Sequence, residues 1–214
     1  MSAFDTLRQL EDAISSCRVC VEAPLWAPLP HEPRPVAVLS STARLCICGQ
    51  APGTRVHASG RPFTDPSGVR LREWMGIEEA QFYNPNLLSI VPMGFCFPGL
   101  DSKGGDKPPR KECRRTWHDH VFRQMPQLET VFAVGAHAHQ YHLGELASKR
   151  SRETIASFKE IWEVTSKRRE NGEGPAVLPL PHPSWRNNAW LKKNAWFEEQ
   201  VLPLVKKEVA RLMA

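Results

Sequence analysis

One stretch of this sequence combines residue types that suit the binding of a small planar ligand. The run CICGQAPGTRVHASGRPFTDPSG leaves an apolar segment at Gly49 and then continues in Gly, Pro and small polar residues as far as Phe63 and Asp65. Such a backbone can bring its N–H groups close to a ligand, and an aromatic ring beside it can stack on a base. The alternative is that Phe63 is a core residue beneath a structural loop.

A second stretch, HPSWRN, carries a histidine that could act on a developing negative charge. His182 follows an apolar run and lies between two prolines, which restrict the direction of its imidazole ring. A neutral histidine can donate one hydrogen bond to an oxyanion. Arg186 and Asn187 could contact phosphates, as many DNA-binding proteins do. The alternative is a loop histidine with a purely structural hydrogen bond.

The spacing of four cysteines predicts a metal site. Cys17 and Cys20 form a CxxC pair, and Cys96 and Cys113 enclose a polar loop of 16 residues. Four thiolates can hold one tetrahedral zinc ion or one iron–sulfur cluster. Both groups accept the same ligands, so the residue types do not choose between them.

Composition limits the classes of protein that the chain can belong to. The chain has 214 residues, a formal charge of +5 and a pI of about 9.0, and no apolar run approaches the length of a membrane span. Its charged N-terminus is unlike a signal peptide, so we expect a cytoplasmic protein, a monomer without a membrane partner. Basic clusters at 149–152, 167–169 and 206–207 permit a polyanion partner, but a charge run of this kind is usually a solvated face.

Alternating apolar and helical segments predict the fold class. Strands are expected at 43–49, 86–93, 130–135 and 176–184, and helices at 4–16, 68–77, 108–125, 136–144 and beyond 194, with 151–164 either a helix or an irregular insertion. This order predicts a single domain, residues 1–214, with a three-layer α/β/α architecture and a central, mainly parallel four-stranded sheet. Residues 1–42 are expected to form a helix and a proline-rich wrap that carries the CxxC pair.

The predicted sheet also indicates where a ligand would bind. Ligands of such folds bind beyond the carboxyl ends of the strands, so the loops at 49–68, 92–108 and 181–190 are expected to converge. Cys46 and Cys48 are interpreted as packing residues on opposite faces of the first strand.

These motifs resemble those of a known family. GQAPGTRVHASGRPFTDPSGVRLREWMGI looks like the first motif of the uracil-DNA glycosylase superfamily, and HPSWRN resembles its closing motif, so the likeness covers roughly residues 40 to 205. The first motif is similar to the thermostable branch, which also carries a 4Fe–4S cluster on four cysteines. HPSWRN is closer to the single-strand-selective branch.

The resemblance implies a role for each matching residue. Phe63 would stack on an extruded uracil, and His182 would stabilise the negative charge that builds on uracil O2. The residues that would line the pocket are Gly49, Gln50 and Ala51. The residues that would contact DNA are Pro183, Ser184, Arg186 and Asn187. The residues that would hold the 4Fe–4S cluster, or zinc as the alternative, are Cys17, Cys20, Cys96 and Cys113.

The sequence departs from the thermostable branch at three places. Gln50 stands where that branch has an acidic residue that activates water, and Asp65 is the second candidate for this base. His57 stands where the branch often has Asp. Ser89 lies nearest to the position of the residue that reads the polar edge of uracil.

The sequence therefore supports three hypotheses. The favoured one is a monofunctional DNA repair glycosylase that hydrolyses the bond to uracil or a related deaminated base, in single- or double-stranded DNA. The second is a non-catalytic nucleic-acid-binding protein on the same fold. The third is a zinc-stapled nucleotide-binding or hydrolase domain unrelated to repair.

Overall fold

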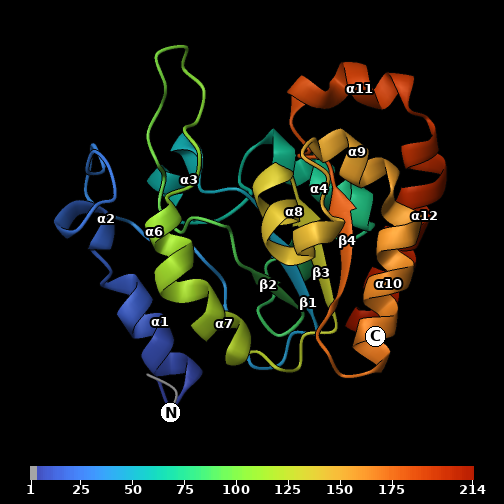
Figure 1. The fold of residues 1–214 in the computed structure, drawn as a ribbon, viewed down its shortest axis with the longest axis horizontal. Helices are drawn as coiled ribbons and strands as arrows, with labels where there is room; N and C mark the ends of the chain where they lie inside the picture. Colours follow the sequence, from blue (N-terminus) through green and yellow to red (C-terminus); the bar gives the residue numbers. More distant parts are fainter. Residues whose placement is uncertain (1–3) are drawn as a thin grey trace.

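A central parallel sheet organises the computed structural model, which describes residues 4–214 (Figure 1). Its strands are β1 (Leu45–Cys48), β2 (Leu88–Ile90), β3 (Thr130–Val134) and β4 (Ala176–Leu180). They lie in the order β2-β1-β3-β4, and every neighbouring pair is parallel. All residues of these strands are buried, as expected for a sheet that is covered on both faces. The predicted four-stranded parallel sheet is confirmed.

One face of the sheet is covered by helices from the first two thirds of the chain. These are α1 (Leu7–Ser15), α6 (Lys111–Cys113), a π-helical turn (Arg114–His118), α7 (Asp119–Arg123) and α8 (Ala136–Leu143). Cys46 and Cys48 both face this layer, with their Sγ atoms 3.5 Å apart. The expectation that they point to opposite faces was wrong, because residues two apart in a strand share a face.

The other face is covered mainly by helices that flank the candidate loops and by the C-terminal tail. These are α4 (Pro66–Met75), α5 (Glu79–Phe82), α9 (Ser151–Ala156), α10 (Phe158–Glu170), a π-helical turn (Phe197–Val201) and α12 (Leu202–Met213). The segment that could have been an irregular insertion is therefore helical. With helices on both faces, the expected α/β/α layering is confirmed.

The N-terminal segment runs along the β2 side of the sheet. Thr6 caps α1 in a capping box with Gln9, and a short helix, α2 (Val19–Glu22), carries the second cysteine of the CxxC pair. The proline-rich stretch that follows is extended, and Val38 forms an antiparallel bridge with Ile90. This wrap brings the CxxC pair toward the chain that leaves β2.

A buried carboxylate, Glu208, connects the amino end of β3 to two helices. Glu208 of α12 accepts hydrogen bonds from Thr130 (2.7 Å), Arg169 (2.6 Å) and Arg211 (2.7 Å). Burial alone would raise the pKa of Glu208, but the hydrogen bonds from these groups outweigh it and lower the pKa to about 2. The network joins β3, α10 and α12.

Two short helices at the carboxyl edge of the sheet, α3 (Thr54–Ser59) and α11 (Asn188–Lys193), lie where the sequence predicted loops. Both belong to segments that follow strands β1 and β4. In Figure 1, α11 and a hairpin around residues 98–107 rise beyond this edge of the sheet. Within residues 4–214, no helix has the length and apolar character needed to cross a membrane.

Candidate active site

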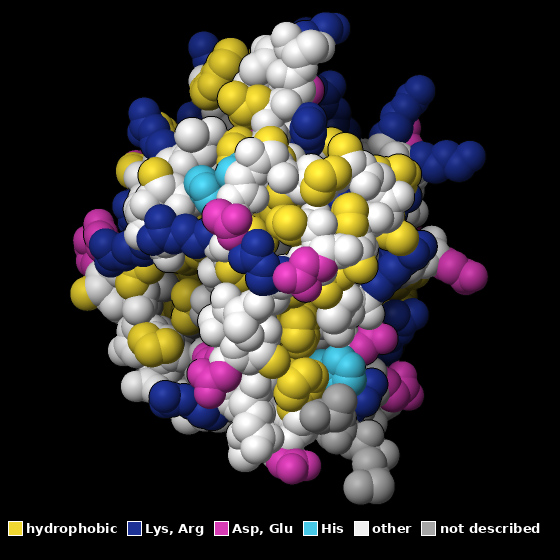
Figure 2. Space-filling view, turned by 90° about the vertical axis from the view of Figure 1, so that its left-hand side faces the viewer, with side chains coloured by type: hydrophobic (Ala, Val, Ile, Leu, Met, Phe, Trp, Pro, Cys, Tyr) yellow, Lys and Arg dark blue, Asp and Glu magenta, His cyan; other side chains and the backbone are white. Residues whose placement is uncertain are grey.

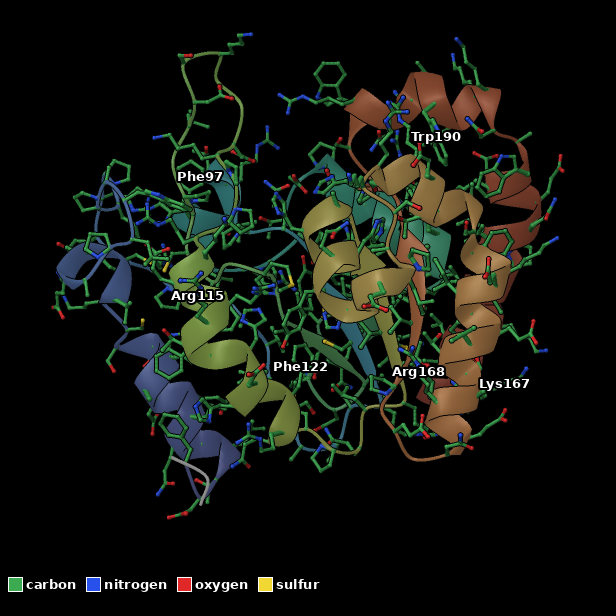
Figure 3. The ribbon with its side chains drawn as sticks, in the orientation of Figure 1. Phe97, Arg115, Phe122, Lys167, Arg168 and Trp190 are labelled. Atoms are coloured by element: carbon green, nitrogen blue, oxygen red, sulfur yellow. The ribbon has the colours of Figure 1, made fainter. Side chains whose placement is uncertain are left out.

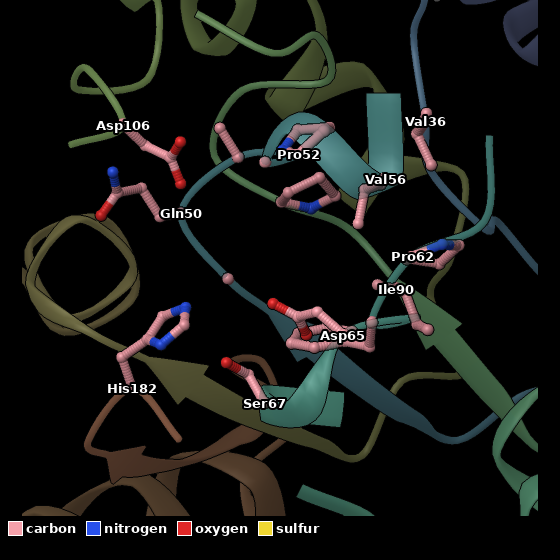
Figure 4. A pocket seen from close by; sticks show the side chains of 15 residues that line it. Val36, Gln50, Pro52, Val56, Pro62, Asp65, Ser67, Ile90, Asp106 and His182 are labelled. Atoms are coloured by element: carbon pink, nitrogen blue, oxygen red, sulfur yellow. The ribbon is translucent and has the colours of Figure 1, made fainter. Parts of the chain in front are cut away.

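The loops that follow β1 and β4 meet beyond the carboxyl edge of the sheet and enclose a cavity of about 90 Å³ (Figure 4). Of the residues expected in the site, those that line it are Gly49, Gln50, Ala51, Phe63, Asp65 and His182. The other lining residues are Val36, Pro52, Gly53, Val56, Pro62, Ser67, Ile90, Pro92 and Asp106. The aromatic ring and the imidazole thus share one cavity, and core side chains do not separate them.

Phe63 is held in an unusual conformation. Its φ of 55° lies in the left-handed region, and among residues 4–214 it is the only non-glycine residue with a positive φ. The Tyr83 hydroxyl donates to the carbonyl oxygens of Pro62 (2.9 Å) and Phe63 (3.1 Å). Phe82 packs edge-on against the Phe63 ring, with 5.8 Å between centroids. Backbone strain that the surroundings maintain in this way is typical of binding sites.

His182 is fixed by its loop. The prolines on either side of it are buried, and the Asn187 side-chain amide donates to the His182 carbonyl oxygen (2.7 Å). Burial lowers the pKa of His182; Asp65 and Asp106 oppose that change and Arg186 adds to it. The imidazole is therefore neutral at neutral pH and has one ring N–H to donate.

Asp106 also reaches this cavity, and the sequence reasoning missed it. A β-bridge between Leu100 and Asp106 closes the hairpin, whose turn is held by Asp101 Oδ1 accepting from the N–H groups of Lys103 (2.8 Å) and Gly105 (2.9 Å). The signal was a carboxylate within the loop at 92–108, one of the three loops expected to converge.

Gln50 lies in the cavity wall, but the expected residue Ser89 and the motif residue His57 do not. Ser89 is fully buried with its hydroxyl 3.7 Å from Met125 Sδ, and the next residue, Ile90, lines the cavity instead. Strand alternation places Ser89 on the opposite face, so the expected substrate contact is corrected. His57 does not line the cavity; its ring lies 4.3 Å from that of His31.

A larger groove of about 810 Å³ shares part of its wall with the cavity. It is lined by the expected residues Pro183, Ser184, Arg186 and Asn187, and by the further arginines Arg55, Arg70 and Arg152. Trp185 at the loop tip is 74% exposed, and Trp190 of α11 also lines the groove (Figure 3). The carboxylates Asp65 and Asp106 also line the groove, so its four arginines leave it with an excess of positive charge. The face in Figure 2 intersperses Lys and Arg with acidic and apolar side chains. The groove is therefore suited to a polyanion that carries flat rings.

The four spaced cysteines also meet, in a second cavity that includes residues of the N-terminal segment and of the chain after β2. Cys17, Cys20, Cys96 and Cys113 all line it. All are free thiols. The Trp117 indole donates to Cys17 Sγ (3.3 Å), and the Phe95 N–H donates to Cys113 Sγ (3.2 Å).

The pKa of Cys96 depends on burial and on the neighbouring thiols. The pKa of Cys96 is raised to about 12, mainly by burial; a hydrogen bond from the Arg34 backbone lowers it, and the nearby Cys20 and Cys17 contribute to the rise. Within residues 4–214, no group of three or more Cys, His, Asp or Glu side chains is placed to hold a single metal ion. The four thiols thus surround a space, and their sulfurs do not converge on one point.

An aromatic ring in the glycine-rich loop after β1 thus lines one cavity with a histidine after β4, beyond the carboxyl edge of a parallel sheet, where ligands of such folds bind. A family model described as the Uracil DNA glycosylase superfamily matches residues 36–206. The match covers most of the chain, so the protein belongs to this superfamily, as its motifs predicted. Membership supports a glycosylase-type function in general.

Proposed function

We propose that the protein is a monofunctional DNA glycosylase that hydrolyses the bond between deoxyribose and uracil or a related deaminated base. The observation that carries the proposal is that Phe63 and His182 line one cavity beyond the carboxyl edge of the sheet. A base must leave the helix to reach such a pocket, at a cost of a few kcal/mol. Stacking on an aromatic ring returns about 1–3 kcal/mol.

His182 is suited to stabilise the leaving group. As the C1′–N1 bond breaks, its electron pair moves into the uracil ring, and negative charge collects on O2. A neutral imidazole can donate its N–H to this oxygen without transferring the proton. The low pKa of His182, caused mainly by burial, keeps the ring in this form.

The arginine-lined groove is suited to bind the DNA that carries the base. Arg186 and the arginines of α3, α4 and α9 can contact phosphates, which position a protein without reading sequence. The exposed Trp185 can press against bases beside the extruded nucleotide. Phosphate contacts of this kind make affinity fall as salt concentration rises.

A strand-cleavage assay separates a glycosylase from a protein that only binds nucleic acid. Oligonucleotides with one uracil or one hypoxanthine, single- and double-stranded, are incubated with the protein and treated with hot alkali. A glycosylase leaves an abasic site that breaks at the modified position, whereas the matched thymine oligonucleotide stays intact. Binding to the uracil oligonucleotide without a break would favour the non-catalytic alternative.

Substitution of Gly68 by alanine should distort the pocket through the backbone of Phe63. A Cβ atom on Gly68 would lie 1.8 Å from the carbonyl oxygen of Phe63, so the Phe63 backbone must shift. We expect a loss of about 1–3 kcal/mol in unfolding free energy and a fall in uracil release. Thermal unfolding and the cleavage assay measure both. The control is Val69→Ala on the same helix, at a residue that is 49% exposed; equal behaviour of the two variants would contradict the contact.

We also propose that Cys17, Cys20, Cys96 and Cys113 hold a structural 4Fe–4S cluster. The residues present fit this group: four free thiols line one space, and two of their sulfurs accept N–H hydrogen bonds. In such a cluster each iron takes one thiolate, so the sulfurs need not converge on one point. When bound, the cluster would cross-link the N-terminal segment to the chain that follows β2.

Metal analysis of the purified protein tests the cluster. We expect about four irons per chain, a brown colour and a broad absorption near about 400 nm. Cys113→Ser should lose the iron, whereas Cys46→Ser, which alters a thiol in the other cysteine pair, should retain it. A colourless protein with one zinc per chain would overturn the iron–sulfur assignment in favour of zinc.

A further inference from the structure

We propose that Asp106, at the base of the hairpin after β2, is the general base that activates the attacking water. This inference rests on the glycosylase function proposed above. It assigns a carboxylate to the reaction in a cavity whose nearby Gln50 carries a neutral amide.

The geometry brings Asp106 to the reacting part of the pocket from a third loop. Asp106 lines the cavity together with Gln50 and His182, and in Figure 4 its carboxylate lies on the same side of the pocket as the Gln50 amide. A Cβ atom on Gly53 would be 3.3 Å from Asp106 Oδ2, so the carboxylate rests against the loop that follows β1. Asp106 is exposed at the mouth, where water can reach it.

The hairpin holds Asp106 in place. The Lys107 N–H donates to the Gly99 carbonyl oxygen (2.9 Å), and the Asp101 N–H donates to the Gly105 carbonyl oxygen (2.8 Å). These bonds flank Asp106 on both sides of its bridge with Leu100. A general base needs such a fixed position relative to the water that it activates.

The other two candidates are less suited to the role. Gln50 is a neutral amide that accepts no proton at neutral pH, and its Nε2 donates to the Lys107 carbonyl oxygen (3.4 Å). Asp65 is the N-cap of α4, and its Oδ1 accepts the Gly68 N–H (3.2 Å). No hydrogen bond is assigned to the Asp106 carboxylate among residues 4–214, so it is available for water.

The charges around Asp106 support the assignment. Partial burial of its carboxylate raises the pKa of Asp106, and the carboxylates of Asp65 and Asp101 raise it further, while Arg186 and His182 act in the opposite direction. A carboxylate with a raised pKa is a stronger base in its ionised form. Since only the ionised form accepts a proton, the rate should fall as the pH drops through this raised pKa.

The proposed step balances in atoms and electrons. A water oxygen forms a bond to C1′ while the water proton passes to Asp106. The C1′–N1 bond breaks, and its electron pair leaves with uracil, whose O2 receives the hydrogen bond from His182. The products are an abasic site with a hydroxyl at C1′, a uracil anion and a protonated Asp106, which returns its proton to the anion or to solvent.

Single-turnover cleavage of a uracil oligonucleotide compares Asp106→Asn, Asp106→Glu and Asp65→Asn. Asp106→Asn keeps the shape of the side chain, and we expect its rate to fall at least about 100-fold with DNA affinity retained. Asp106→Glu should recover part of the rate. Asp65→Asn should lose less, because asparagine still caps a helix. Ser102→Ala, at the exposed hairpin tip, should match the wild type in both rate and melting temperature.

The pH profile distinguishes a base from a positioning residue. The rate of the wild type should fall as the pH is lowered. Asp106→Asn should not show this fall at low pH, whereas His182→Asn should still show it. If Asp106→Asn cleaves as fast as the wild type, or is slow and still shows the fall at low pH, the assignment is wrong although the protein is a glycosylase. A wild type that releases no uracil overturns the proposed function itself, and Asp106 with it.

Discussion

Replacement of His182 by alanine should lower the single-turnover rate of uracil release about 100- to 1,000-fold. The alanine variant loses the ring N–H that we propose as the donor to the leaving base, and water that enters the space is a poorly oriented substitute. The buried prolines on either side of His182 keep the backbone of the loop in place, so the protein should still fold and bind DNA.

The matched variant is Gln50→Ala, which changes a side chain in the same cavity wall. Its loss should be smaller, because Gln50 contributes neither a charge nor a proton acceptor. Quenched-flow measurement with protein in excess over DNA gives the rate of the chemical step for both variants. Equal losses would contradict the role given to His182.

Replacement of Glu208 by alanine should lower the free energy of unfolding by about 3 kcal/mol. Removal of one partner from a buried ion pair costs about 3–5 kcal/mol because the other charge is left unpaired. Arg169 and Arg211 are partly exposed, with 23% and 39% of their side-chain surface accessible, which favours the lower end. Urea unfolding followed by circular dichroism measures the change.

The stability that Glu208 provides should also depend on pH in a defined direction. Its pKa is depressed to about 2, so the contribution is fully present above the unfolded value of about 4.5 and is lost as the pH falls toward 2. The control is Glu163→Ala, which removes an exposed i,i+4 pair with Lys167 and should change the stability far less, because solvent screens such pairs. If Glu208→Ala matched this control, the network would not stabilise the fold.

The sheet could be predicted from sequence because its signals are local. Each strand is a short apolar run beside a Gly or Pro, and parallel pairing follows from the helices between them. Short helices were missed, as in Thr54–Ser59, where six residues give too little periodicity to detect. The break in the helix at 108–125, with a π-helical turn at Arg114–His118, likewise has no signal in spacing alone.

Some residues of the candidate site could likewise be predicted from the sequence, and others could not. The shared cavity of Phe63 and His182 was expected, because both follow strands whose carboxyl ends meet at one edge. Ser89 could not be placed reliably, because a shift of one residue in strand register reverses the face to which a side chain points. Asp106 lines the pocket from the base of a hairpin, a tertiary contact that no local pattern encodes.

The central claim is that the slot between Phe63 and His182 cleaves a uracil nucleotide, and the release of the free base tests it most directly. A single-stranded oligonucleotide with one isotopically labelled uracil is incubated with excess protein, and the small-molecule fraction is analysed by mass spectrometry. The account predicts one free labelled uracil per oligonucleotide with the wild type and very little with His182→Ala in the same time. Labelled uracil that stays in the strand with the wild type, or leaves it equally fast with both proteins, would contradict it.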